Sequence, residues 1–254
     1  MDLNLKGKVV LVTGGTRGIG FQISKDFLYE GSKVLAIGKK QPNSSSFNEV
    51  KNIFKDSFFF YACDVTNETS LEECSQWCQQ EIGSIDIVIS NVGNGSSTQE
   101  KITATKQWNK VWDVNFTSAL NTARVFTPEL IKSNGTIIFI SSIAGLEFIG
   151  APIDYSTAKS ALLAFAKSLS YRLAPNVRVN VVVPGNVWTE DGTWPNKMNE
   201  NPESVQKMLI EKVPLQRFGH PKDISDIVLF LSSERASFIT GSNFVIDGGQ
   251  TVGF

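Results

Sequence analysis

Short apolar runs alternate with amphipathic stretches along almost the whole chain. The runs are rich in β-branched residues, and they predict strands at 8–12, 32–38, 58–63, 85–91, 136–142, 178–183 and 243–247. Most of the stretches between them repeat apolar residues at helical spacing, and they predict helices at 19–28, about 71–82, 105–131, 153–173 and 224–232. Residues 39–46 read as a polar turn.

The apolar runs do not alternate with polar residues, which is typical of a parallel sheet whose two faces are covered by helices. This order predicts an α/β fold, a Rossmann-type doubly wound sheet of seven parallel strands. No Pro/Ser-rich linker and no internal repeat interrupts the alternation, so we expect residues 1–254 to form a single domain. The least regular stretch is 188–209, which contains Gly192, Pro195 and Pro202. It predicts a substrate loop or lid at about 188–212, although a plain surface excursion would have the same composition.

Composition narrows the choice of partners. The chain of 254 residues is 41% hydrophobic and 19% charged, typical of a globular protein, and its net charge of −1 gives no reason to expect nucleic acid or a membrane surface as partner. No apolar run approaches the ~18 residues of a membrane span, and residues 1–8 lack the build of a signal peptide. Cys63, Cys74 and Cys78 have no histidine near them, so we expect reduced thiols of a cytoplasmic protein and no metal site.

A glycine-rich turn, Thr13-Gly14-Gly15-Thr16-Arg17-Gly18-Ile19-Gly20, lies between the first predicted strand and the first predicted helix. The free N–H groups at a helix N-terminus attract a phosphate group, and glycine lets the backbone turn sharply and approach the ligand. Taken alone, such a segment can be only a turn. With its flanking strand and helix it predicts a phosphate site.

A second cluster carries acid–base chemistry. Tyr155 and Lys159 are four residues apart on a predicted helix and therefore share one face. A tyrosine hydroxyl has a pKa near ~10, and an ammonium group beside it lowers that pKa by stabilising the phenolate. Ser142 ends a predicted strand, where its hydroxyl can bind a substrate oxygen. Taken singly, these residues also fit a core tyrosine, a solvated lysine and a helix cap.

Together with other ordered motifs, these residues resemble the short-chain dehydrogenase/reductase family of the 250-residue type, over essentially the whole chain. The further matching motifs are Asp64-Val65, Asn91 with Gly93, Asp113-Val114-Asn115, Pro184-Gly185 with Thr189, Thr240-Gly241 and Asp247-Gly248-Gly249. One departure is Ser90-Asn91-Val92-Gly93, where the family's usual sequence is Asn-Asn-Ala-Gly; the added bulk lies beside the expected adenosine site. The sole histidine, His220, lies outside the motifs, and we expect a structural role for it.

The resemblance implies a role for each matched residue. Tyr155 would be the general acid in reduction or the base in oxidation, and Ser142 would orient and polarise the substrate oxygen. Lys159 would lower the pKa of Tyr155 and hold the nicotinamide ribose, while Asn115 would kink its helix and anchor a water that relays protons. The dinucleotide would be bound by Gly14, Thr16, Arg17, Gly18, Ile19, Gly20, Gly38, Lys39, Asp64, Val65, Asn91, Gly93, Tyr155, Lys159, Pro184, Gly185, Val187 and Thr189. The resemblance also implies a homotetramer or a homodimer.

The choice of dinucleotide depends on the residue that closes the second strand. An acid there binds the ribose 2′-hydroxyl of NAD and repels a 2′-phosphate. In this chain the position is Gly38, followed by Lys39 and Lys40, and Arg17 lies in the first turn. Three cations and no acid favour NADP(H) over NAD(H) by charge attraction. The alternative is that the lysines only form a solvated turn.

The substrate is the least determined part. We expect its pocket to include Ser142, Ile143, Tyr155, Asn186 and Trp188, with Trp194 nearby. Polar groups mixed with indoles suit a sugar or a sugar-nucleotide derivative, unless the indoles only pack the lid. A 3-oxoacyl thioester on an acyl-carrier protein is the alternative. The alternative outside enzymes is a sensor that binds the dinucleotide without catalysis. The chain keeps all four residues of the catalytic pattern, Asn115, Ser142, Tyr155 and Lys159, which argues against a sensor.

Overall fold

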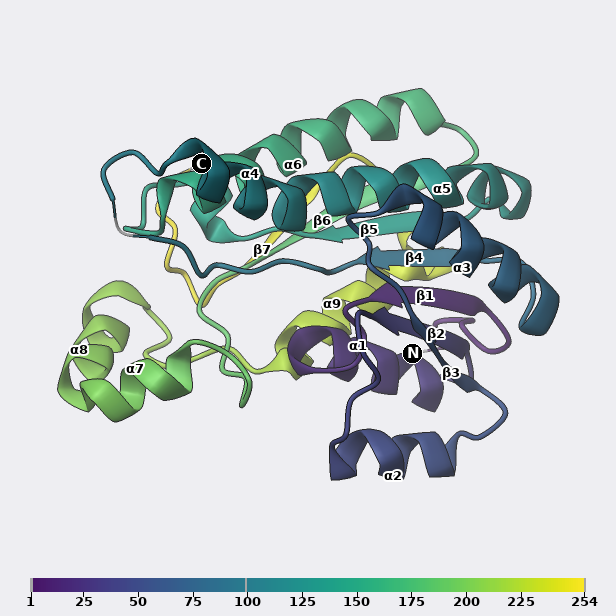
Figure 1. Cartoon of the computed structure of the whole chain (residues 1–254), viewed down its shortest axis with the longest axis horizontal. Helices are drawn as coiled ribbons and strands as arrows, with labels where there is room; N and C mark the ends of the chain where they lie inside the picture. Colours follow the sequence, from purple (N-terminus) through teal and green to yellow (C-terminus); the bar gives the residue numbers. More distant parts are fainter. Residues whose placement is uncertain (1, 99, 254) are drawn as a thin grey trace.

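Seven parallel strands form one sheet in the order β3-β2-β1-β4-β5-β6-β7, as Figure 1 shows for the computed structural model, which describes residues 2–98 and 100–253. The predicted doubly wound sheet is therefore confirmed. The strands are β1 Val9–Thr13, β2 Lys33–Gly38, β3 Phe58–Ala62, β4 Ile87–Ser90, β5 Thr136–Ile140, β6 Arg178–Pro184 and β7 Asn243–Ile246. The chain crosses from β3 past β1 to β4, so β1 and β4 are neighbours where the strand order reverses. Ligands of such sheets bind at this point, outside the carboxyl ends of the strands.

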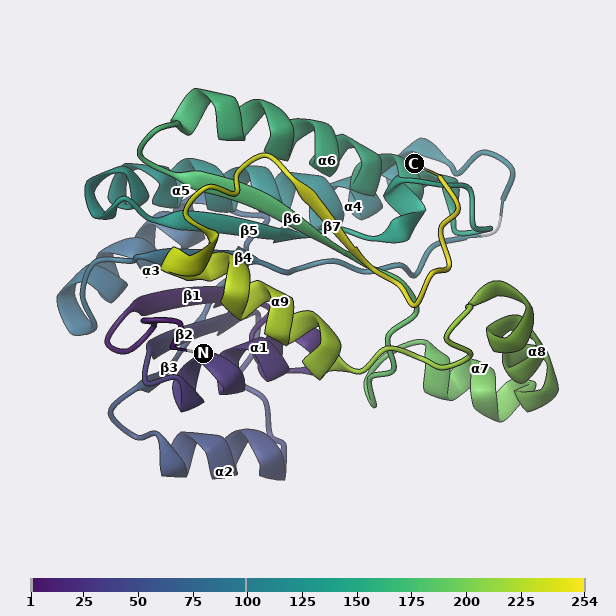
Figure 2. The ribbon, with the colours of Figure 1, turned by 180° about the vertical axis from the view of Figure 1, so that it is seen from behind.

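Helices cover both faces of the sheet (Figures 1 and 2). On one face α1 (Gly18–Tyr29) packs against α9 (Pro221–Ser232), and their apolar residues form one core with alternate strand positions such as Val10 and Val12. On the other face α3 (Glu68–Glu81), α5 (Ser118–Ser133) and α6 (Ile153–Leu173) pack against Val9 and Leu11 and their equivalents. Because both faces are buried, the strands carry apolar residues at successive positions.

The segment 39–46 differs from the predicted polar turn in its last two residues. Helix α2 begins there and covers Ser45–Ile53. The side chain of Ser44 caps this helix by accepting a hydrogen bond from the Phe47 backbone N–H, and Phe47 and Val50 are buried. A Ser-rich run therefore starts a short amphipathic helix.

The predicted long helix at 105–131 is interrupted. It consists of α4 (Thr105–Trp112), a π-helical turn at Asp113–Thr117, and α5. Single π-turns within helices are rare and often occur at functional sites. Asn115, the residue expected to kink this helix, lies in the π-turn.

The stretch expected to be irregular, 188–209, is largely helical. Helices α7 (Trp194–Glu200) and α8 (Pro202–Lys212) form a pair that projects beyond the body of the sheet (Figures 1 and 2). Pro195 and Pro202 lie in the first turns of these helices, where proline needs no N–H partner. The prolines therefore mark helix starts, and the prediction of irregular structure was wrong for this reason. No helix within the described ranges has the length and apolar character that crossing a membrane requires.

Candidate active site

A cavity of about 590 Å³ opens at the carboxyl ends of β1, β4, β5 and β6. Its walls come from the turn after β1, the loop after β4, the end of β5, the start of α6 and the segment from Pro184 to the first residues of α7. The cavity therefore lies at the switch point that the strand order defines. It brings together the glycine-rich turn and the acid–base cluster, which are more than 100 residues apart in the sequence.

The glycine-rich turn is shaped for a close ligand. Gly14 and Gly18 have positive φ angles of 63° and 53°, which residues with a side chain rarely adopt. A Cβ atom at Gly20 would lie 2.3 Å from the carbonyl oxygen of Gly14, so the turn can be this tight only with glycine there. Arg17 is the N-cap residue of α1 and its side chain does not cap the helix. The first N–H groups of α1 are thereby left to face an anion.

The acid–base cluster lies at the start of α6, where Lys159 is buried and Tyr155 is half-buried. Tyr155 and Lys159 lie one helical turn apart, and the Lys159 Nζ lies 5.9 Å from the centre of the Tyr155 ring. The Lys159 Nζ donates a hydrogen bond to the carbonyl oxygen of Ile140 at 3.0 Å. Ser142 follows β5, and its Oγ accepts a hydrogen bond from the Ala144 backbone N–H at 3.2 Å in a 3-10 turn.

Burial dominates the electrostatics of this cluster. It lowers the pKa of Lys159 from 10.5 to about 8, because a buried ammonium loses its hydration. It raises the pKa of the Tyr155 hydroxyl, and hydrogen bonding with Ser142 offsets only part of that rise. The expected lowering of the Tyr155 pKa by Lys159 is therefore not found in this state. The lysine ammonium faces Ile140 and the phenol remains protonated at neutral pH.

Asn115 lies in the π-turn, is buried, and does not itself line the cavity; it contacts the loop after β4, which does. Its Oδ1 accepts a hydrogen bond from the Asn94 backbone N–H at 3.0 Å, and its Nδ2 donates to the carbonyl oxygens of Asn94 and Val111 at 3.0 and 2.9 Å. A Cβ atom at Gly93 would lie 2.8 Å from the Lys159 Nζ and 3.0 Å from the Asn115 Oδ1. The backbone at Gly93 therefore packs directly against both polar groups.

Comparison with known proteins agrees with this arrangement. A family model described as enoyl-(acyl carrier protein) reductase matches residues 14–251. The short-chain dehydrogenase/reductase SDRA of Arabidopsis thaliana is 35% identical over 249 residues, which cover 97% of this chain and 95% of that protein. The 3-oxoacyl-(acyl-carrier-protein) reductase FabG of Aquifex aeolicus is 33% identical over 256 residues, covering 98% of this chain and all 100% of the relative.

The chain belongs to the short-chain dehydrogenase/reductase family. Members of this family use a nicotinamide dinucleotide to interconvert a CH–OH group and a carbonyl group, and this chain is an oxidoreductase of that type. Among solved structures, L-sorbose reductase of Gluconobacter frateurii, complexed with NADPH and L-sorbose, superposes with a TM-score of 0.92 at 27% identity over 100% of both chains. The aldohexose dehydrogenase of Thermoplasma acidophilum has a TM-score of 0.86 at 30% identity, covering 98% of this chain and 96% of its own.

Most of the residues that the family resemblance assigned to the dinucleotide line the cavity of this short-chain dehydrogenase/reductase. They are Gly14, Arg17, Gly18, Ile19, Gly20, Asn91, Gly93, Tyr155, Lys159, Pro184, Gly185, Val187 and Thr189. The unusual Val92 also lines it, and its Cγ2 would lie 3.3 Å from a Cβ at Gly14. The Thr13 Oγ1 accepts hydrogen bonds from the Asn91 and Val92 backbone N–H groups, which ties β4 to the glycine-rich turn.

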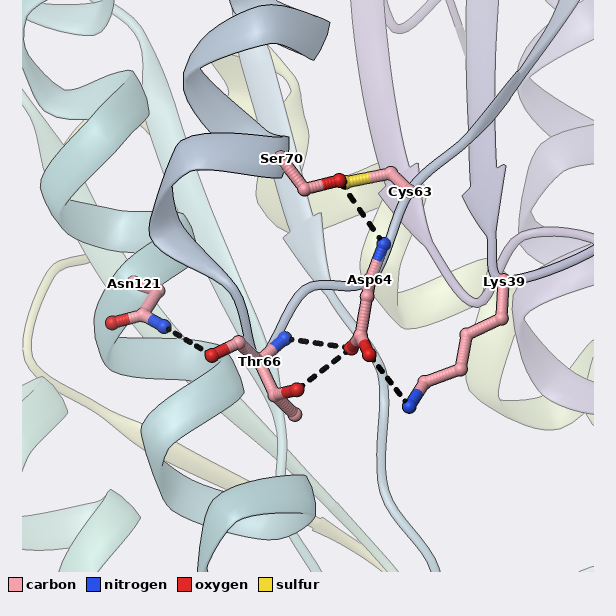
Figure 3. A network of polar contacts seen from close by, with 6 residues as sticks. All are labelled: Lys39, Cys63, Asp64, Thr66, Ser70 and Asn121. Atoms are coloured by element: carbon pink, nitrogen blue, oxygen red, sulfur yellow. Dashed lines mark hydrogen bonds and ion pairs between the residues drawn. The ribbon is translucent and has the colours of Figure 1, made fainter.

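The remaining assigned residues do not line the cavity; Gly38, Lys39, Asp64 and Val65 lie at or just after the ends of β2 and β3, and Thr16 lies in the turn after β1. Figure 3 shows the Lys39 ammonium paired with the Asp64 carboxylate at 2.8 Å, while Asp64 also accepts hydrogen bonds from Thr66. Burial raises the pKa of Asp64, but the bonds from Lys39 and Thr66 outweigh it, so that the net pKa is lowered. Thr16 lies against Gly38: its Oγ1 would be 3.5 Å from a Cβ there. The side chain of Val65 is buried in the core.

The residues expected to bind substrate are only partly brought together. Ser142 and Tyr155 line the cavity, whereas Ile143 is buried in the core beneath it. Asn186 lines a separate cavity of about 280 Å³ and donates to the Gln250 Oε1 at 2.9 Å. Trp188 does not line the main cavity; its ring packs against Phe218 at a centroid distance of 5.4 Å. This packing corresponds to the alternative in which the indole only supports the lid.

Several polar residues that line the cavity were not predicted from the sequence. Asp191, Thr193 and Asn196 come from the segment before and inside α7. No motif marks them, because their position depends on how α7 packs. His220 lies outside the cavity as the N-cap of α9, where its backbone N–H donates to the Asp223 carboxylate. Within the described ranges, no group of three His, Cys, Asp or Glu side chains is arranged to hold a metal ion.

Proposed function

We propose that this short-chain dehydrogenase/reductase is an NADPH-preferring enzyme that reduces the carbonyl group of a small polyhydroxylated compound, a sugar or a sugar-nucleotide derivative. The observation that carries the proposal is the single cavity in which the glycine-rich turn meets Ser142, Tyr155 and Lys159. A phosphate-binding turn and a proton donor within one cavity suit a dinucleotide and a carbonyl compound that react with each other.

The residues present fit a dinucleotide. The tight turn at Gly14, Gly18 and Gly20 leaves room for a pyrophosphate beside the first N–H groups of α1. Gly93 packs directly against Lys159 and Asn115, and a Cβ at this position would displace the Lys159 ammonium from its place at the cavity wall. When bound, the nicotinamide supplies the hydride, and the protein supplies orientation and the proton.

Each residue of the cluster then has a defined task. Ser142 donates a hydrogen bond to the carbonyl oxygen and orients it toward Tyr155. The protonated Tyr155 hydroxyl gives its proton to that oxygen as the alcohol forms. Lys159 provides a positive charge behind the phenol and binds the ribose, and Asn115 keeps the loop after β4 in place and anchors the water that returns a proton toward Lys159. The raised pKa of Tyr155 supports the direction of reduction, because the donor is protonated at neutral pH.

Charge at the end of β2 supports the preference for NADPH. Gly38 presents no carboxylate to repel a 2′-phosphate, and the exposed Arg17 directly follows Thr16, the residue that lies against Gly38. Lys39 is paired with Asp64, so a 2′-phosphate would compete with that carboxylate for the ammonium. A doubly charged phosphate near two cations gains more from this arrangement than a hydroxyl does.

The lining of the cavity supports a polar substrate. Asn94, Ser96, Thr193 and Asn196 present hydrogen-bonding groups, and the Trp194 indole lines the same cavity. The structural similarity to a reductase complexed with L-sorbose agrees with this chemistry. The similarity to 3-oxoacyl-(acyl-carrier-protein) reductases keeps an acyl thioester as the alternative. An acidic carrier protein needs a basic surface, however, and on α5 the Arg124 guanidinium is already paired with the Glu68 carboxylate at 2.8 Å.

The test is the loss of NADPH absorbance with a panel of L-sorbose, other ketoses, oxidised sugar nucleotides and an acetoacetyl thioester. We expect turnover of at least one sugar compound and little turnover of the thioester. Tyr155→Phe should remove activity while NADPH still binds. Turnover of the thioester alone would replace the proposed substrate class, and NADPH binding without any turnover would favour a sensor.

The cofactor preference has its own experiment. Arg17→Ala combined with Lys39→Ala should raise the KM for NADPH by about tenfold or more and leave the KM for NADH nearly unchanged. Lys33→Ala is the matched control, because this exposed lysine begins β2 at the opposite end of the strand. Equal small changes for both cofactors would overturn the preference.

Three further expectations belong to this proposal. The helices α7 and α8 would form the lid of a single-domain enzyme, since Trp194 and Asn196 of α7 already line the cavity.

The exposed apolar side chains of Ile131 and Tyr171 on α5 and α6 support a homo-oligomer, a tetramer or a dimer, that pairs through these helices. The three cysteines are free thiols, which supports a cytoplasmic enzyme. Light scattering tests the oligomer directly.

A further inference from the structure

One buried carboxylate near the active site has no role in the proposed chemistry. Asp154 immediately precedes Tyr155 in the first turn of α6 and is only 1% exposed. Its Oδ1 accepts a hydrogen bond from the Tyr155 backbone N–H at 2.8 Å, and its Oδ2 accepts one from the Ser97 Oγ at 2.5 Å. Within the described ranges no lysine, arginine or histidine forms an ion pair with it.

Burying a carboxylate is costly unless its oxygens are hydrogen-bonded. Glu129, which is 5% exposed, shows how such a residue can be purely structural: it accepts from Ser75, Gln79 and the Ile85 backbone N–H, and so ties α3 and the segment before β4 to α5. Asp154 instead binds a single hydroxyl from a loop. The helix N-terminus stabilises its charge in part, and Ser97 supplies the remaining contact.

The loop that Ser97 belongs to is a wall of the cavity. Asn94, Gly95 and Ser96 line the cavity, and a Cβ at Gly95 would lie 3.7 Å from the Tyr155 ring. Asn115 holds the near end of this loop through the backbone of Asn94. Asp154 holds the far end through Ser97. The segment between the two anchors crosses the face of the ring.

We propose that Asp154 is a positioning residue that, through the Ser97 hydroxyl, holds the loop 93–97 against the Tyr155 ring and so fixes the distance between the substrate carbonyl and the Tyr155 hydroxyl. Asp154 and Tyr155 are neighbours in the first turn of α6. The same helical turn therefore positions both the loop 93–97, through Asp154, and the proton donor Tyr155. A displacement of about 1 Å at a reacting centre can cost up to about a hundredfold in rate. The inference rests on the proposed role of Tyr155.

The decisive variant is Ser97→Ala, which removes the donor and leaves the Tyr155 side chain untouched. We expect kcat/KM for the best carbonyl compound of the panel to fall about tenfold or more, with the KM for NADPH changed less than about twofold. Hydrogen exchange of the amides at 93–97 in the free protein should become at least about tenfold faster. Ser97→Thr keeps the hydroxyl and should restore both values. Thr98→Ala, at the exposed next position, is the matched control.

Asp154→Asn provides a second variant, because its remaining oxygen can accept only one of the two hydrogen bonds; it should give an intermediate loss. Unchanged exchange in Ser97→Ala overturns the proposal, as does faster exchange with unchanged kcat/KM or an equal loss in Thr98→Ala. A wild-type protein that reduces no member of the panel refutes the proposed function, and the exchange measurement then decides whether Asp154 anchors the loop.

Discussion

The chemistry of the site depends on how two neighbouring side chains are buried. The Tyr155 hydroxyl has a raised pKa because burial disfavours the phenolate, and Ser142 is the one group that moves this pKa downward. The raised pKa keeps the hydroxyl protonated at neutral pH and leaves little phenolate to accept a proton. Reduction and alcohol oxidation should therefore respond to pH in opposite ways.

We expect kcat/KM for reduction to stay level through neutral pH, where the Tyr155 phenol is protonated. Oxidation of the product alcohol with NADP⁺ should rise with pH, because it requires the phenolate. Ser142→Ala removes the hydrogen bond that lowers the Tyr155 pKa, so the midpoint of this rise should move to higher pH. The exposed Ser160→Ala on α6 is the control. A midpoint that moves to lower pH in Ser142→Ala would contradict this account of the pKa.

Lys159 gives a prediction about stability. Burial lowers its pKa from 10.5 to about 8, so between these pH values the unfolded chain binds more protons than the folded one. The free energy of unfolding contributed by Lys159 therefore rises with pH through this window, and its penalty is complete below about pH 8. This lowering of the pKa corresponds to a penalty of about 3 kcal/mol.

Lys159→Met should accordingly be inactive yet more stable than the wild type at neutral pH. Denaturant unfolding at a series of pH values measures the difference. The advantage of the variant should shrink as the pH rises from about 8 to 10.5. A stability advantage that does not change with pH in this range would show that the pKa of Lys159 is not lowered in the folded protein.

Among individual residues, those with a motif could be predicted and those without one could not. Ser142, Tyr155, Lys159 and the glycines form spaced patterns, and the structure brings them to one cavity. The contact between Ser97 and Asp154 joins residues 57 positions apart, and no pattern in the sequence marks it. That Trp188 packs within the lid was left open as an alternative, and its partner Phe218 carries no motif either.

At the scale of elements, interruption of a helix has the clearest functional consequence. The π-turn Asp113–Thr117 directs Asn115 toward the loop after β4, where it makes two hydrogen bonds to Asn94; a third goes to the carbonyl oxygen of Val111 in α4. The apolar spacing of residues 105–131 fits a continuous helix, since a π-turn adds one residue without changing the apolar character of either half. Its presence could be expected only from the family resemblance.

Asn115→Leu keeps the volume of the side chain and removes all three hydrogen bonds. We expect kcat to fall about tenfold or more, and the free energy of unfolding to fall by about 1–3 kcal/mol because the Asn94 N–H is left without its partner. Thr122→Val is the control: it removes a buried hydrogen bond to Ser118 further along α5, outside the cavity. It should lower stability and leave kcat unchanged. Equal loss of kcat in both variants would mean that the helix is merely destabilised.

Short helices were the elements that sequence patterns predicted least well. The start of α2 lies in a Ser-rich run, and α7 and α8 contain prolines, so composition favoured turns in both places. In each case the polar or proline residue occupies a helix start, where it is favourable. Composition alone does not distinguish a helix start from a loop when the helix has fewer than about four turns.

For the whole molecule, the sheet was predictable because two independent requirements agree. Burial of both faces makes every strand apolar, and right-handed crossovers between parallel strands leave few strand orders. The strand order then determines where β1 and β4 separate, and hence where the cavity forms. Substrate identity does not follow from this logic, because the substrate side is built from the loops and from α7.

A dinucleotide bound in the cavity, which opens at the carboxyl ends of four strands, would stabilise the whole fold. Binding to the native state adds about 2.7 kcal/mol to the free energy of unfolding at a concentration of one hundred times Kd. If NADH binds a hundredfold more weakly, the same concentration of NADH adds only about 0.4 kcal/mol. Thermal unfolding with equal concentrations of the two cofactors should therefore show a much larger shift in Tm with NADPH.

In the Arg17→Ala, Lys39→Ala variant the two shifts in Tm should become similar. The variant lacks the cations that would bind the 2′-phosphate, and the rest of the molecule is common to NADPH and NADH. Equal shifts in the wild type would remove the charge argument for NADPH while leaving the cavity and its acid–base cluster intact.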